Sequence, residues 1–223
     1  MNEYYKRQVQ LWGEDVQQNL KDKSIAIIGC GGLGCSLAYA LSSSGIGQIH
    51  LVDFDTISAH NIHRQIAFSL QDLGKYKCEV LASRLKERVL DDVNIMSYVS
   101  NFEEFTKKQI PFDLLLDASD NLHVRSQMDK YAKGKNIPWI YTSVEEFNGQ
   151  VCFFDRASFN GIFKIQDIAP KGQCAPMVMQ MASFEANLAL RYLLGLGINK
   201  DKLYYLCFDK GLDLSIKGFQ ISI

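Results

Sequence analysis

Short apolar runs alternate with longer amphipathic stretches along most of the chain. The predicted strands share a run of mainly apolar residues, and they span 24–28, 48–53, 93–99, 112–117, 138–143 and 150–154. The predicted helices share a periodic apolar side, and they span 32–44, 75–90, 121–135 and 177–194. Strands that alternate with helices in this way predict an α/β fold with a Rossmann-like, doubly wound and mostly parallel sheet.

The two ends of the chain extend this pattern. Residues 2–21 predict one N-terminal helix, whose apolar side consists of Val9, Leu11, Trp12, Val16 and Leu20. Short runs near the C-terminus predict two or three antiparallel strands, at Leu203–Phe208, Leu212–Ile216 and Phe219–Ile223. We expect one domain over 1–223, in which the nucleotide-binding core spans 24–154, a crossover loop 155–176, and the C-terminal helix and strands 177–223.

Composition narrows the class of protein. The 223 residues include 24 Lys and Arg against 25 Asp and Glu, so that no strong net charge draws the protein to nucleic acid or to an anionic membrane. No apolar run approaches the ~18 residues of a membrane span, and the N-terminus lacks an apolar signal core, so we expect a cytoplasmic protein. The six cysteines form no CxxC pair, and no zinc is therefore expected.

A glycine-rich turn follows the first predicted strand. Gly29, Gly31 and Gly34 form G-x-G-x-x-G between that strand and the next helix. Such glycines allow a tight turn whose N–H groups approach a phosphate, and the helix N-terminus adds partial positive charge. Asp53 ends the second predicted strand, 48–53, and lies 24 positions after Gly29. A carboxylate at this place can bind a ribose. Together they predict a nucleotide site.

Two cations follow Asp53 and bear on which reaction the nucleotide undergoes. Arg64 and Lys77 suit a reaction at phosphorus, because cations stabilise the charge that builds on phosphate oxygens. An NAD-dependent oxidoreductase would explain the glycine turn and Asp53, but hydride transfer leaves Arg64 and Lys77 without a role. Either cation taken alone is more typical of a solvated surface charge, and its place directly after Asp53 is what favours a role at phosphate.

A third polar cluster follows the predicted strand 112–117. Asp120 lies at the carboxyl end of this strand, the edge at which open α/β sheets bind ligands, and is a candidate magnesium ligand. The alternative is that Asp120 or Asn121 only caps the helix that follows.

These motifs, taken in order, resemble the adenylating enzymes of the ubiquitin-activating (E1-like) superfamily, above all the bacterial ThiF/MoeB type. The matching residues cover nearly the whole chain and are Arg7 and Gln8; Gly29, Gly31, Gly32 and Gly34; Asp53, Asp55, Asn61, Arg64, Gln65 and Lys77; Asp117, Asp120, Asn121 and Arg125; and Ala175–Ala186. Many relatives also carry two CxxC pairs that hold zinc, and this chain has none.

The resemblance implies a reaction and its partners. ATP and Mg²⁺ would be used to adenylate the C-terminal carboxylate of a ubiquitin-like sulfur-carrier protein of the ThiS/MoaD type, releasing pyrophosphate, for thiamine or molybdopterin biosynthesis. By the same resemblance Asp53 would hold the ribose, Asn61, Arg64 and Lys77 would face the phosphates, and Asp120 would bind magnesium. Arg7 would reach the site of a neighbouring subunit, which implies a homodimer.

Several alternatives stay open. The acceptor could be a peptide or small-molecule carboxylate, and the chain could be a non-catalytic partner subunit, although every charged motif residue is present. Cys174 lies near the place where ThiF-like enzymes carry a sulfur-transfer cysteine, but an ordinary loop thiol fits that position as well.

Overall fold

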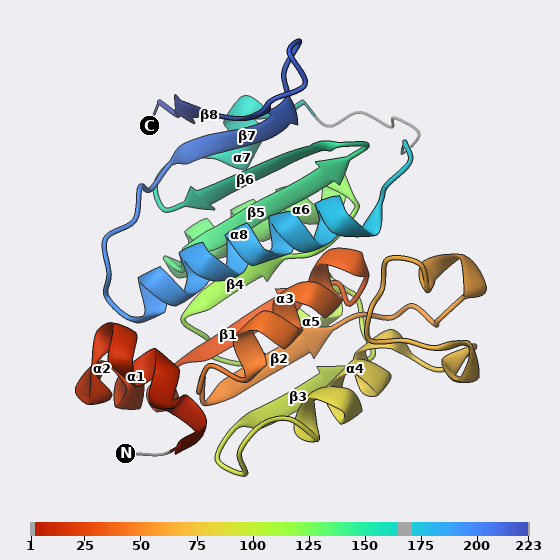
Figure 1. Ribbon diagram of the computed structural model, residues 1–223, viewed down its shortest axis with the longest axis vertical. Coiled ribbons are helices and arrows are strands. Elements are labelled where there is room, and N and C mark those ends of the chain that lie inside the picture. Colours follow the sequence, from red (N-terminus) through yellow and green to blue (C-terminus); the bar gives the residue numbers. More distant parts are fainter. Residues whose placement is uncertain (1–2, 165–170, 223) are drawn as a thin grey trace.

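The computed structural model describes residues 3–164 and 171–222. In this part of the chain the strands form one eight-stranded sheet in the order β3-β2-β1-β4-β5-β6-β7-β8 (Figure 1). The strands are β1 Ser24–Ile28, β2 Gln48–Val52, β3 Asn94–Tyr98, β4 Leu114–Asp117, β5 Trp139–Glu145, β6 Asn148–Phe154, β7 Lys202–Phe208 and β8 Leu214–Gln220. Neighbours from β3 to β5 are parallel and those from β5 to β8 are antiparallel, which confirms the predicted fold class.

Helices cover both faces of the sheet, mainly over its parallel part but also over β5 and β6 (Figure 1). One face is covered by α3 Gly32–Ser42, α4 Lys77–Lys86 and α8 Ala175–Leu193. The other is covered by α5 Phe102–Lys107, α6 Leu122–Lys135 and α7 Phe159–Ile162. On the α8 side Ile27, Leu51 and Met181 share a buried aliphatic core. Burial on both faces explains why these strands are apolar without interruption.

The N-terminal segment differs from the single helix predicted over 2–21. Gly13, with a φ of 89°, separates α1 Lys6–Trp12 from α2 Glu14–Asn19. Of the predicted apolar side, Leu20 is buried whereas Leu11 is 76% exposed. Both helices lie at the C-terminal end of α3, where the side chain of Gln17 donates to the carbonyl of Ser44 over 2.8 Å.

Several short elements also differ from prediction. The six-residue helix α5 was not predicted, because a single short turn leaves little periodicity; the Asn101 side chain caps it by accepting from the N–H of Glu104 over 2.9 Å. Short 3₁₀ turns at Ala59–Asn61 and Leu70–Asp72 interrupt the connection between β2 and α4.

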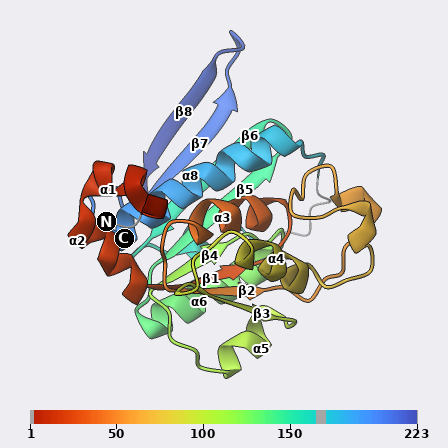
Figure 2. The ribbon, with the colours of Figure 1, turned by 60° about the horizontal axis from the view of Figure 1, so that its bottom comes forward.

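The crossover and the C-terminus complete the fold. The predicted crossover loop 155–176 contains α7, and its residues 165–170 lie outside the described part. The described C-terminal residues form two antiparallel strands, within the predicted two or three, because β8 continues through Phe219 (Figure 2 shows the β7–β8 hairpin projecting from the body). No helix of the described part is long and apolar enough to span a membrane.

Candidate active site

A large cleft opens at the carboxyl ends of the parallel strands. Its volume is about 1240 Å³, and it is lined by the glycine turn, the ends of β2 and β4, the start of α6 and the β5–β6 hairpin. The chain order of the strands reverses between β1 and β4, which makes this edge the switch point of a doubly wound sheet. Ligands bind at such points in open α/β folds.

The glycine turn is pressed against the end of β4. Gly29 has a φ of 99°, and a Cβ there would lie 2.5 Å from the carbonyl oxygen of Ala118. A Cβ at Gly34 would collide with the carbonyl of Gly29, so helix and turn approach each other without side chains between them. The helix α3 begins at Gly32, and Gly32 and Leu33 of its first turn line the cleft. A glycine turn that leads into a helix N-terminus in this way is the arrangement that commonly binds phosphate.

Asp53 lies beside this turn at the end of β2. Its two carboxylate oxygens accept from the N–H of Cys30 over 2.6 Å and from the N–H of Asp55 over 2.7 Å. Burial raises the pKa of Asp53, and the two N–H donors oppose that shift. The carboxylate is therefore held in one orientation where a ribose hydroxyl can reach it.

The two predicted phosphate cations both line the cleft but are held differently. Lys77 is only 6% exposed and its ammonium forms an ion pair with Asp55 over 2.7 Å. Arg64 is partly exposed, and its guanidinium donates to the carbonyl of His60 over 3.2 Å. Lys77 thus has a fixed partner before any nucleotide binds, whereas Arg64 keeps most of its five donors for one.

Asn61 and Gln65, which come from the same connection, are buried at the cleft wall. The side-chain oxygen of Asn61 accepts from the N–H of Ser58 over 3.0 Å and caps a 3₁₀ turn. The side-chain oxygen of Gln65 is buried without a hydrogen-bond partner in the described part of the chain, and a Cβ at Gly31 would lie 3.5 Å from its amide nitrogen. Asn61 therefore shapes the loop, and Gln65 supports the glycine turn.

The start of α6 shows which of Asp120 and Asn121 caps the helix. The Asn121 side chain accepts from the N–H groups of His123 and Val124, at 2.8 and 3.3 Å, so the cap is Asn121. Asp120 is exposed at the cleft beside it. One carboxylate facing a phosphate-binding turn fits Mg²⁺, which proteins usually hold through one or two carboxylates and the phosphates of the substrate.

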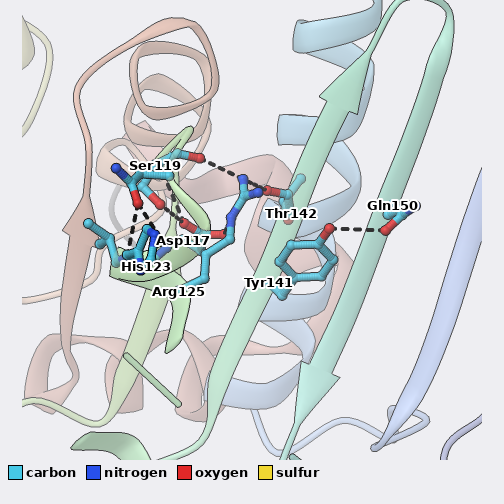
Figure 3. A network of polar contacts seen from close by, with 9 residues as sticks. Asp117, Ser119, His123, Arg125, Tyr141, Thr142 and Gln150 are labelled. Atoms are coloured by element: carbon cyan, nitrogen blue, oxygen red, sulfur yellow. Dashed lines mark hydrogen bonds and ion pairs between the residues drawn. The ribbon is translucent and has the colours of Figure 1, made fainter. Parts of the chain in front are cut away.

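Asp117 and Arg125 form a buried ion pair at the wall of the cleft, which Arg125 lines (Figure 3). The Arg125 Nε donates to Asp117 over 2.7 Å, and its Nη2 donates to the carbonyls of Ser119 and Thr142 over 2.6 and 3.0 Å. Its guanidinium also lies over the ring of Tyr141, 5.0 Å from the centroid. Burial raises the pKa of Asp117 and the charge of Arg125 opposes it. One side chain thus connects β4, α6 and β5.

The interpretation of the sequence missed a buried acid in α8 and two polar side chains near the start of β6. Glu185 of α8 is completely buried, burial raises its pKa well above the ordinary value, and neither carboxyl oxygen has a hydrogen-bond partner of normal geometry in the described residues. No pattern distinguishes it within an apolar helix. Asn148 and Gln150 of β6 line the cleft, and their alternation was a usable signal.

Arg7 and Cys174 are not brought into the cleft of their own chain. Arg7 is exposed on α1, where it donates to the side chain of Gln10 over 3.1 Å, and α1 lies at the far end of α3 from the glycine turn (Figure 1). Cys174 precedes α8 as its N-cap residue and packs against the main core, next in sequence to the cleft residue Gln173.

The described residues contain no group of three or more His, Cys, Asp and Glu side chains that could hold a metal ion. A site built entirely from protein ligands is therefore absent from this part of the chain. Mg²⁺ held by Asp120 and substrate phosphates needs no such group.

The cleft at the switch point of this doubly wound sheet combines the glycine turn, the carboxylate of Asp53 and the cations Arg64 and Lys77. This combination is typical of a Rossmann-like nucleotide-binding enzyme. In sequence, the profile of the ThiF family matches residues 5–218. The chain is 30% identical to the molybdopterin-synthase adenylyltransferase of Haemophilus influenzae, over 98% of this chain and 91% of the relative. It is 28% identical to the sulfur carrier protein adenylyltransferase of Thermus thermophilus, over 83% of this chain and 74% of the relative. The chain belongs to the ThiF family.

Solved structures agree with this fold. The crystal structure of E. coli MccB with MccA-N7isoASN matches with a TM-score of 0.85 at 22% identity, over 100% of this chain and 74% of that one. The structure of E. coli MccB with ATP matches with a TM-score of 0.82 at 23% identity, over 100% and 73%. Family and fold confirm the predicted resemblance and the adenylyltransferase class.

Proposed function

We propose that the protein is a cytoplasmic, ATP- and Mg²⁺-dependent enzyme that adenylates the C-terminal carboxylate of a ubiquitin-like sulfur-carrier protein for thiamine or molybdopterin biosynthesis. The observation that carries the proposal is the convergence of the glycine turn, Asp53, Lys77 and Asp120 on one cleft. Relatives named for adenylation of sulfur carriers and for molybdopterin synthase support the choice of acceptor.

The reaction requires alignment more than acid–base chemistry. A carboxylate oxygen of the acceptor attacks the α-phosphorus of ATP, the new bond gives an acyl adenylate, and the bond to the departing pyrophosphate breaks. Asp53 orients the ribose and the glycine turn binds phosphate oxygens, so that the α-phosphorus is fixed for attack. Arg64 and Lys77 stabilise the charge that develops on phosphate.

Asp120 would hold Mg²⁺, which neutralises charge on the phosphates when bound. The protein's own part is the free carboxylate at the end of β4, which Asn121 leaves available by taking over the cap of α6. An oxidoreductase would give neither Asp120 nor the Lys77–Asp55 pair a role.

The test is ATP–pyrophosphate exchange with purified carrier proteins of the ThiS and MoaD types, and with short peptides and small carboxylates as alternative acceptors. We expect exchange that depends on a carrier protein and on Mg²⁺. Exchange with a peptide or small acid alone would replace the carrier-protein assignment, and ATP binding without exchange for any acceptor would indicate a non-catalytic subunit. Elemental analysis of the same preparation should find no stoichiometric zinc.

A homodimer with shared sites is part of the proposal. Arg7 is exposed and lies far along α3 from its own cleft, so it would act in a second copy, where a guanidinium stabilises transition-state charge. Subunits carrying Arg7→Ala are mixed with subunits carrying Asp120→Ala, each inactive alone. In a mixed dimer, the site with intact Asp120 receives the intact Arg7 of its neighbour, so about one site per dimer regains exchange. No recovery despite proven subunit exchange contradicts action in trans.

A further inference from the structure

The part of the cleft away from the glycine turn is lined by a set of paired tyrosine and amide side chains. The Tyr141 hydroxyl of β5 donates to the side-chain oxygen of Gln150 over 3.0 Å, as Figure 3 shows. The Tyr205 hydroxyl of β7 donates to the side-chain oxygen of Asn148 over 3.1 Å. All four side chains line the cleft. We call Asn148 and Gln150 the amide pair.

The two tyrosines determine which way the amide pair points. Because each hydroxyl donates to an amide oxygen, the NH₂ group of each amide is turned away from its tyrosine. Within the described part of the chain neither NH₂ group has a protein partner. Two oriented donors therefore remain for a ligand in the cleft.

The spacing of the amide pair matches an extended peptide. Asn148 and Gln150 are two residues apart on β6, so their side chains lie on the same face, about 6.8 Å apart along the strand. Carbonyl groups on one side of an extended peptide recur at the same two-residue spacing. We propose that the amide pair binds backbone carbonyls of an extended peptide whose C-terminal carboxylate is the acceptor. This inference rests on the proposed function and names the acceptor's form.

Charge in this part of the cleft argues against a small free acid as its ligand. Among the described residues that line it, Lys171 lies 3.9 Å from Glu145 and 3.7 Å from Glu146, so carboxylates already surround its ammonium. Arg125 is buried and paired with Asp117. Among the described residues an anion therefore finds no unpaired cation beside the amide pair, whereas an uncharged peptide backbone finds two donors.

The amide pair is also connected to the nucleotide part of the cleft. The guanidinium of Arg125 is fixed by Asp117 and by the carbonyls of Ser119 and Thr142, and it covers the ring of Tyr141. Tyr141 in turn orients Gln150. Arg125 thus positions both the loop that carries Asp120 and, through Tyr141, the amide donor of Gln150. The proposed peptide site is therefore held at a fixed place relative to the phosphate site.

The test uses pentaglycine, which has a peptide backbone and a free carboxylate but no side chains. Its dissociation constant is measured by calorimetry with protein saturated with α,β-methylene-ATP, for the natural chain and for Gln150→Met and Asn148→Ala. Loss of one hydrogen bond of about 1 kcal/mol should weaken pentaglycine about fivefold for each variant. The affinity for the ATP analogue should not change. Gln180→Met, on the exposed side of α8 outside the cleft, is the matched control.

A second ligand separates backbone binding from general damage to the cleft. Pentaglycine in which one internal peptide group is replaced by CH₂–NH lacks one carbonyl. It should bind the natural chain more weakly than pentaglycine, and the double variant should not distinguish the two ligands. No binding of pentaglycine, or equal binding by all variants, overturns the inference. Peptide binding without ATP–pyrophosphate exchange for any acceptor would instead overturn the proposed function alone.

Discussion

The parallel and the antiparallel part of the sheet differ in how much of each strand is exposed. In the parallel part, β1 and β4 are buried along their whole length between two layers of helices. In the antiparallel part, nearly all of β8 is exposed and the strand pairs only with β7, in the hairpin that projects in Figure 2. The parallel part therefore presents only its strand ends to ligands, whereas the antiparallel part can also use a whole strand face.

This difference appears in the site itself. The contacts proposed for the nucleotide come from loops at strand ends, where the glycine turn and a few charged side chains line the cleft. The acceptor part is formed by side chains that neighbouring antiparallel strands place side by side, as Tyr141 and Gln150 show. Substitutions in the two parts should consequently fail in different ways.

The largest effect is expected at the end of β4. Asp120→Ala should lower Mg²⁺-dependent ATP–pyrophosphate exchange by about a thousandfold or more, since it removes the side chain that would hold the cation on the phosphates. Because Asp120 is exposed, the melting temperature should stay the same. Asp91→Ala, at an exposed position before β3, is the control. Exchange near the natural rate would mean that Asp120 holds no metal.

Arg125→Met tests the buried connection between the two parts. It leaves Asp117 buried without its partner, and we expect unfolding by urea to show a loss of about 3–5 kcal/mol. Lys107→Met breaks the exposed pair with Glu103, 2.9 Å apart, and should cost less than about 1 kcal/mol. Similar losses for the two variants would show that the buried pair is not a structural connection.

A matched pair of leucines compares the two parts directly. Leu51 of β2 is fully buried and Leu214 of β8 is 50% exposed. Leu51→Ala should cost about 2–5 kcal/mol of unfolding free energy, because it removes core contacts and leaves a cavity. Leu214→Ala should stay within about 0.5 kcal/mol. A large loss for Leu214→Ala would reveal that the hairpin is covered in solution.

Glu185 gives a smaller, pH-dependent effect. Burial raises its pKa well above 4.5, so the folded protein keeps a proton that the unfolded chain releases. This contribution is complete below pH 4.5 and is lost as pH rises towards the pKa of the folded state, by at most about 1.4 kcal/mol per pH unit. Glu185→Gln should therefore flatten the decline of stability between pH 5 and 8. Parallel urea midpoints for both proteins would contradict this.

The smallest effect is expected at Cys174. Since this thiol packs at the start of α8 and is not among the cleft-lining side chains, Cys174→Ser should leave ATP–pyrophosphate exchange unchanged. If Cys174 transfers sulfur after adenylation, the same variant should lose thiocarboxylate formation on the carrier protein, measured by mass spectrometry. Equal yields would leave it a packing residue.

Prediction from sequence succeeded where chemistry and local structure share one short segment. Gly29–Gly34 combine a tight turn with the start of α3, and the buried strands need apolar residues on both faces, so both features are visible as patterns. It failed at Gly13, where one residue in a positive-φ conformation divides the predicted N-terminal helix, and at α5, which is too short to show a period.

The sequence by itself determined the class of fold, the nucleotide motif and the candidate charges, because each depends on neighbours within a few residues. Only the tertiary structure decided that Asn121 is the cap, that Lys77 pairs with Asp55, and that Arg125 bridges two strands. It also decided that Glu185 is buried and that the amide pair faces the cleft. These facts depend on which distant segments meet across the sheet, and that pairing is fixed by the packing of the whole core rather than by any local pattern.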